Sequence, residues 1–178
     1  MAEVIQLKSF KRKQAATRGF RSWSKRFGEK LDEQTRLSDL SDETLLFLIS
    51  PGDQNVFVLY ELVMGVLDLG PSSDFFHLDK AGKMEVIDIS IHLLDQFRFE
   101  CMRRLNWLKS GAAQPLSIIE LIEQYPLQKV QGPAAIPSLN KFHPKYRVFQ
   151  ELPELERETF IRKQIPEAIE EFGRMLQD

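Results

Sequence analysis

The amphipathic pattern of residues 80–109 constrains the fold more than any other feature of the chain. Apolar side chains recur there at intervals of three and four, as on one broad face of an α-helix. These positions are Met84, Ile87, Ile91, Leu94, Phe97, Cys101, Met102, Leu105 and Leu108. Ile89, Leu93 and Trp107 widen this face to more than half of the circumference. Such a helix would be about 45 Å long, whereas a chain of this size has a radius of gyration of about 16 Å. We therefore expect a central helix that other helices cover on most sides and that Gly111 ends.

Two shorter helices are expected before this central one. Ser41 precedes a helix expected at residues 42–49 and suits its N-cap. Asp53 follows a turn and would cap a second helix, which Gly70 and Pro71 would stop. The inward positions expected on this second helix are Val56, Leu59, Val63 and Leu67.

Prolines shape the rest of the chain. Pro115 suits the first position of a helix over residues 115–125, and Pro166 kinks or divides a final helix that starts near Glu154. The inward positions expected on the final helix are Ile165, Ile169, Phe172 and Leu176. Between these helices lie Pro126, Gly132, Pro133, Pro137, Pro144 and Pro153. This density predicts an irregular segment at about 126–153, with at most a short extended piece at 146–149.

The sequence therefore predicts an all-α fold, a helical bundle around the helix at about 80–109 with a proline-rich irregular segment at about 126–153. With 178 residues, the chain has the length of one domain. We expect residues 1–35 to form a basic N-terminal arm or docking helix and residues 36–178 to form a single helical domain.

The charge distribution is strongly asymmetric. Residues 1–30 hold nine Lys and Arg but two acidic side chains, a net charge of +7, although the whole chain carries −2. No Lys or Arg lies between Arg36 and Lys80, and eight acidic residues fill that interval. A positive arm is thus followed directly by a negative segment, which indicates either mutual docking or an anionic partner for the arm.

The arm combines aromatic and basic side chains at helical spacing. Phe20, Trp23, Phe27 and Leu31 define a narrow apolar seam, and the cations spread over the opposite side. Such a helix suits nucleic-acid phosphates along residues 8–30, an anionic lipid surface, or a groove on a partner protein. Alternatively, the seam docks on the chain's own core or on a sister subunit. The candidate partner-binding residues are Arg18, Phe20, Arg21, Trp23, Lys25, Arg26 and Phe27.

A second stretch, residues 141–149, interleaves cations and aromatics. Lys141, Lys145 and Arg147 could hold phosphates while Phe142, Tyr146 and Phe149 stack on bases. The favoured alternative is that the aromatic side chains pin a long loop to the core and the cations stay solvated. We add Lys141, Lys145 and Arg147 to the candidate partner-binding residues.

The sequence offers few candidates for a metal site or a catalytic nucleophile. Asp88, His92 and Asp95, joined by Glu85, share one face of the central helix, which resembles a metal site but more simply forms a solvated polar stripe. Cys101 lies on the apolar face and is expected in the core. No phosphate-binding glycine loop, zinc spacing or nucleophile motif occurs.

These observations favour a non-enzymatic helical interaction module whose basic aromatic arm contacts a protein partner or a sister subunit, and no cofactor is implied. The alternatives are a nucleic-acid-binding protein, or a metal-dependent or acid/base enzyme with a cleft near residues 126–153 in which His143 would act. A single cysteine and the lack of a signal-peptide pattern predict a cytoplasmic location. No stretch is apolar enough to predict a transmembrane segment.

Overall fold

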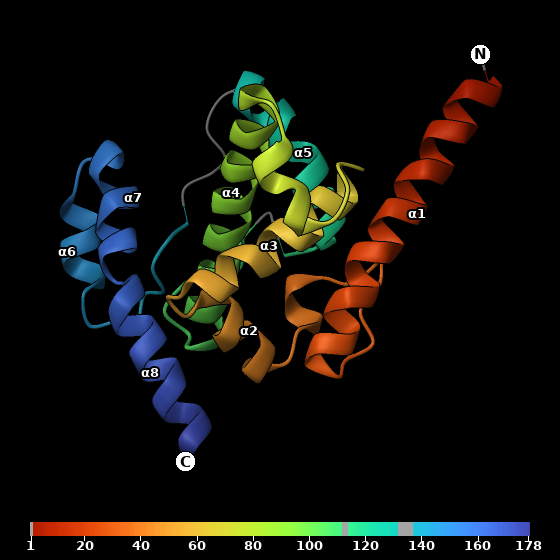
Figure 1. Cartoon of the computed structure of the whole chain (residues 1–178). Helices are drawn as coiled ribbons and strands as arrows, with labels where there is room; N and C mark the ends of the chain where they lie inside the picture. Colours follow the sequence, from red (N-terminus) through yellow and green to blue (C-terminus); the bar gives the residue numbers. More distant parts are fainter. Residues whose placement is uncertain (1, 112–113, 132–136) are drawn as a thin grey trace.

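A computed structural model describes residues 2–111, 114–131 and 137–178, and these residues form α-helices and short 3₁₀ helices without any strand. The elements in chain order are α1 (Ala2–Phe27), η1 (Leu37–Asp39), α2 (Asp42–Ile49), α3 (Asp53–Val66), η2 (Ser72–His77), α4 (Lys80–Arg104), α5 (Ile118–Gln131), α6 (Tyr146–Glu151), α7 (Glu154–Lys163) and α8 (Ile165–Gln177). Figure 1 shows them packed as a bundle, with the N-terminal half of α1 extending past the other helices. The predicted all-α bundle is confirmed.

Helix α4 lies at the centre, because α2, α3, α5, α8 and η1 all pack against it. Its buried face is rotated from the predicted one. Ile89, Leu93 and Phe97 are fully buried, but Met84 and Ile91, expected to point inward, are exposed. When a helix is apolar around most of its circumference, its sequence does not determine which face is buried, because several faces would bury a similar apolar area.

Helix α4 ends at Arg104, earlier than residue 109, and Gly111 is not its terminator. Asn106 adopts a left-handed φ of 60° just past the helix. The backbone N–H groups of Asn106 and Trp107 donate to the carbonyl oxygens of Arg103 and Met102, each at 2.9 Å. These two bonds satisfy carbonyls that the helix end would otherwise leave free, the arrangement known as a Schellman motif. Helix α3 ends in the same way at Asp68, whose φ is 57°, before Gly70 is reached.

The expected start is confirmed for α2 and corrected for α3 and α5. Ser41 caps α2 by accepting a hydrogen bond from the backbone N–H of Thr44. For α3, Gly52 occupies the N-cap, and Asp53 is the first helical residue without a capping bond. Helix α5 starts at Ile118 because Ser117 and Glu120 exchange backbone hydrogen bonds as a capping box, which displaces the start expected at Pro115.

The proline-rich segment is more helical than predicted. Helix α5 continues through Pro126 to Gln131, and residues 146–149, expected to be extended, belong to helix α6. Pro133 and its neighbours at 132–136 lie outside the described residues. Pro166 divides the final helix, as one of the two expected outcomes, into α7 and α8.

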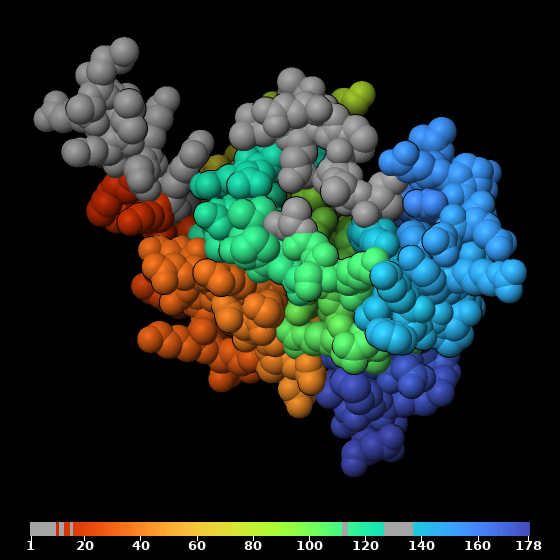
Figure 2. Space-filling model, turned by 180° about the vertical axis from the view of Figure 1, so that it is seen from behind, coloured from red at the N-terminus to blue at the C-terminus, as the bar shows by residue number. Residues whose placement is uncertain are grey.

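The buried side chains form two hydrophobic clusters. The larger one joins α1, α2, α3, α4, α5 and the inner face of α8, including Phe172. The smaller one lies where the C-terminal helices meet the end of α4, and its members are Phe99, Met102, Leu108, Leu139, Phe149, Ile161, Ile165 and Ala168. Seen from behind in Figure 2, the C-terminal helices occupy one side and residues 28–45 the other, with residues 104–111 between them.

Candidate interaction surface

Helix α1 is seated on the bundle by its aromatic seam. Phe20 and Trp23 are fully buried, and Phe27 is partly buried against the same cluster. The Trp23 ring meets Phe20 and Phe27 edge to face, with centroid distances of 6.3 and 5.8 Å. Gly28, with a φ of 67°, ends the helix in the left-handed conformation that glycine adopts without strain. The seam therefore docks within its own chain, the first of the two docking alternatives.

A glycine lets α1 approach α3 closely. A Cβ placed on Gly19 would lie 3.3 Å from Cδ1 of Leu62 and 3.5 Å from its backbone. The two helices run antiparallel, since Arg26 lies beside Glu61 and Arg18 lies beside Asp68. Ala16 is the first buried residue of α1 among those described, and the earlier part of the helix extends beyond the C-terminal end of α3 (Figure 1).

The cations of α1 remain on the outside. Arg18 and Arg26 make long ion pairs with Asp68 at 3.5 Å and Glu61 at 3.7 Å. Arg21 and Lys25 are exposed and have no ion-pair or hydrogen-bond partner among the described residues. Exposed pairs of this kind contribute about 1 kcal/mol or less, so they do not commit α1 to its own domain.

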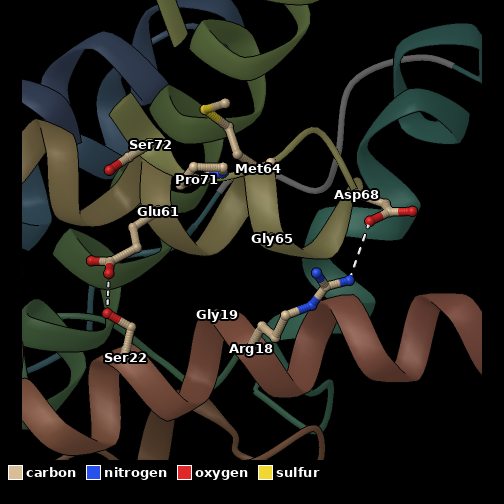
Figure 3. A pocket seen from close by; sticks show the side chains of 10 residues that line it. Arg18, Gly19, Ser22, Glu61, Met64, Gly65, Asp68, Pro71 and Ser72 are labelled. Atoms are coloured by element: carbon tan, nitrogen blue, oxygen red, sulfur yellow. Dashed lines mark hydrogen bonds and ion pairs between the residues drawn. The ribbon is translucent and has the colours of Figure 1, made fainter. Parts of the chain in front are cut away.

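A cleft of about 260 Å³ lies between α1 and α3. Figure 3 shows Arg18 reaching across it toward Asp68 and Ser22 pointing at Glu61, to which the Ser22 hydroxyl donates a hydrogen bond. The remaining lining consists of small or apolar residues, namely Gly19, Met64, Gly65, Gly70, Pro71 and Ser72. The cleft thus carries paired charges and no histidine or cysteine among its described lining.

An aromatic patch lies where the N-terminal half of α3 meets η2. Its exposed members are Phe57 and Phe76, which are 40% and 65% exposed. The rings of Phe57 and Phe76 lie 6.3 Å apart, over a stacked pair formed by Tyr60 and Phe75. Sequence reasoning missed this patch, although Phe57 falls off the expected seam of α3. Val56, which was expected on the seam, is also exposed.

Of the three cations of the second basic segment, Lys145 is bound to the C-terminal helices, whereas Lys141 and Arg147 are exposed, as the favoured alternative predicted. The ammonium of Lys145 donates to Oε1 of Gln164 at 2.6 Å and to Oε2 of Glu167 at 3.1 Å. Arg147 forms an exposed pair with Glu151, while Lys141 is exposed. Of the aromatic anchors, Phe149 is buried as expected, but Phe142 is 92% exposed and pins nothing within the described residues.

The polar face of α4 is not the solvated stripe that was expected. Asp95 is buried and accepts a hydrogen bond of 2.6 Å from Arg162, with Arg98 at 3.4 Å on its other oxygen. The His92 ring packs on Tyr125 with centroids 4.8 Å apart, and this burial lowers the pKa of His92. Glu85 stays exposed. Among the described residues, no group of three or more His, Cys, Asp or Glu side chains is placed to hold a metal ion.

Of the remaining nucleophile and base candidates, Cys101 is buried and His143 is partly buried. Cys101 is buried as expected, and burial raises its pKa to about 12. Burial and the charge of Lys145 lower the pKa of His143, whose Nδ1 accepts a hydrogen bond from the Lys145 backbone N–H. A thiol with a raised pKa is a poor nucleophile near neutral pH.

Comparison with known proteins adds no relative, because no family model, no curated protein and no solved structure matches the chain. Within the part of the chain that the structure describes, each helix is too short or too polar to cross a bilayer.

Proposed function

We propose that this protein is a non-enzymatic helical interaction module that contacts a partner protein through the outer side of α1. One observation carries the proposal: the aromatic face of α1 is buried, whereas Arg21 and Lys25 on the same helix are exposed without partners among the described residues. A helix anchored on one side presents its other side in a fixed orientation, which lowers the entropic cost of binding.

The charge around α1 favours a protein over a nucleic acid. The surface of α3 beside α1 carries Glu61 and Asp68, both within a stretch that holds no Lys or Arg. Carboxylates within a Debye length of about 8–10 Å would repel a continuous phosphate backbone. A protein segment that combines a few carboxylates with apolar side chains avoids that repulsion. It also suits Phe10, which is 58% exposed on the extended part of α1.

The non-enzymatic assignment is supported by the state of the reactive side chains. Cys101 lies in the core with a raised pKa, which keeps its thiol protonated, and the ring of His92 is packed against Tyr125. The polar groups of the cleft, Arg18 and Asp68 or Ser22 and Glu61, satisfy one another. A cytoplasmic location remains a prediction, in keeping with the buried thiol.

Fluorescence anisotropy with a labelled peptide rich in Glu, Asp and Phe tests the proposal, with labelled duplex DNA as the competing probe. The variant Lys13→Glu/Arg21→Glu/Lys25→Glu should bind the peptide about tenfold more weakly, since each lost charge pair is worth up to about 1 kcal/mol. The control Lys80→Glu/Lys109→Glu/Lys163→Glu has the same change in net charge and should bind like the wild type.

Two results would overturn the proposal. Equal peptide affinity in the two triple variants would mean that total charge, and not α1, governs binding. Tighter binding of DNA than of peptide, with affinity falling steeply as salt rises, would favour the nucleic-acid alternative along residues 8–30.

A further inference from the structure

We infer that the partner of α1 is a second copy of this chain, and that the extended half of α1, residues 2–15, docks on the aromatic patch of that copy. The inference rests on the proposed function, because it names the partner of the same helix. The contact is reciprocal, so each copy supplies one arm and one patch around a two-fold axis.

The aromatic patch has the character of a protein-binding surface. Phe57 and Phe76 expose large parts of their rings, although Tyr60 and Phe75 pack tightly beneath them. Contiguous exposed apolar side chains with a polar rim mark interaction sites in soluble proteins. Two exposed carboxylates lie close to these rings along the chain: Asp53 precedes Phe57 by one turn of α3, and Asp74 precedes Phe76 by two residues in η2.

The charges of the two segments indicate that residues 2–15 bind the aromatic patch. The segment that carries the patch, residues 37–79, holds eight acidic side chains and no Lys or Arg. Residues 2–15 hold Lys8, Lys11, Arg12 and Lys13 with Glu3 as the opposing charge, and the ring of Phe10 is exposed among them. A basic helix with an exposed phenylalanine complements an acidic surface with exposed phenylalanines, in both charge and apolar content.

The arm of one chain is directed away from its own patch. Arg18 of α1 lies beside Asp68, two residues past the end of α3, and residues 2–15 continue for about 20 Å beyond that point. Phe57 lies in the opposite direction, about 16 Å back along α3 from Asp68. Because the two helices are antiparallel, only the arm of another copy reaches the patch.

The first test measures the mass of the full chain by sedimentation equilibrium over a range of concentrations. We expect a monomer–dimer equilibrium that weakens as salt rises. Phe57→Ser/Phe76→Ser should raise the dissociation constant at least about tenfold, since the patch loses both of its exposed aromatic anchors. Phe142→Ser removes a still more exposed phenylalanine elsewhere and should change the dissociation constant less than about twofold.

The second test mixes two monomeric variants. Lys8→Glu/Lys11→Glu/Arg12→Glu/Lys13→Glu disables the arm and leaves the patch, whereas Asp53→Lys/Asp74→Lys reverses the rim and leaves the arm. Each variant alone should stay monomeric, with a circular dichroism spectrum like that of the wild type. Mixed together, they should form a heterodimer through one native arm–patch contact and one contact in which the charges of both sides are reversed.

The outcomes separate this inference from the proposed function. A wild type that stays monomeric but still binds the acidic peptide through α1 overturns the second copy as partner and leaves the module standing. A dimer that the arm variant does not weaken, in a chain that fails to bind the peptide, contradicts both. Mixed variants that do not associate overturn the reciprocal contact.

Discussion

The indole N–H of Trp23 donates a hydrogen bond of 3.0 Å to the backbone carbonyl of Val58, 35 residues farther along the chain. The bond joins α1 to α3 inside the core, where the Trp23 ring also meets Phe97 of α4 at a centroid distance of 6.3 Å. A single side chain thus connects three helices. The second half of α1 is therefore part of the hydrophobic core.

Replacing Trp23 should destabilise the whole fold. Trp23→Phe removes the hydrogen bond and part of the ring, and should lower the free energy of unfolding by about 1–2 kcal/mol. Trp23→Ala also leaves a cavity and should cost about 3–5 kcal/mol. Urea denaturation followed by circular dichroism measures both. Phe10→Ala, at an exposed position on the same helix, should cost less than about 0.5 kcal/mol. A similar loss in all three variants would contradict the role of the buried seam.

Arg104 should be irreplaceable by lysine. Its guanidinium donates to Asp42 at 2.7 Å and to the carbonyl oxygens of Leu37 and Leu40 at 2.9 and 2.8 Å, and it also binds the buried Glu100. An ammonium cannot span these acceptors, so Arg104→Lys should cost about 2–4 kcal/mol. Arg174→Lys, which alters an exposed pair with Glu170, is the matched control and should cost less than about 0.5 kcal/mol. Thermal unfolding of the two variants in the same buffer measures both losses of stability.

The fold class followed from the sequence because its determinants are local. Ser41 and Pro166 act on the turn in which they lie, and both behave as predicted. Pro126 does not end α5, since Ile118, Leu121 and Ile122 bury the preceding turns and offset the lost backbone bond. Packing elsewhere in the molecule, and not local sequence, decides that position.

Two further features depended on information absent from local patterns. Helix ends at Asp68 and Asn106 rely on left-handed residues other than glycine, so the nearby Gly70 and Gly111 were misleading. The aromatic patch exists because η2 folds back and brings Phe75 and Phe76 against α3. A loop of this kind is placed by tertiary contacts, and no spacing rule in the sequence relates position 57 to position 76.

His92 should make stability depend on pH below about 6.5. Burial lowers the pKa of His92, and the charge of Asp95 opposes that effect only in part. The unfolded chain therefore binds a proton at about pH 6.5 while the folded one resists it, so stability falls as the pH drops. In His92→Phe, which keeps a ring against Tyr125, the fall should be smaller by up to about 1.4 kcal/mol per pH unit. Urea midpoints at several pH values between about 5 and 7.5 measure it, and parallel curves for both proteins would refute the assignment.

Cys101 should resist thiol reagents until the protein unfolds. Burial raises its pKa to about 12, and its Sγ lies 3.9 Å from the carbonyl oxygen of Ala168 in the packed core. Thiolate is the reactive form, so native protein should react with a disulfide reagent at a rate set by opening of the fold. The same protein in concentrated urea should react at once. Immediate stoichiometric labelling without denaturant would show that the thiol is accessible.

The continuity of α1 from Ala2 to Phe27 has a mechanical consequence. Because the helix is continuous, the rotation of its outer half about the helix axis is fixed by the rotation of its buried half. One residue inserted between positions 15 and 16 would turn the outer half by about 100° while Trp23 stayed in place, and seven would restore the phase to within about 20°. The angular position of Lys13 around the axis of α1 is thus fixed by the packing of the Trp23 indole ring about three turns away.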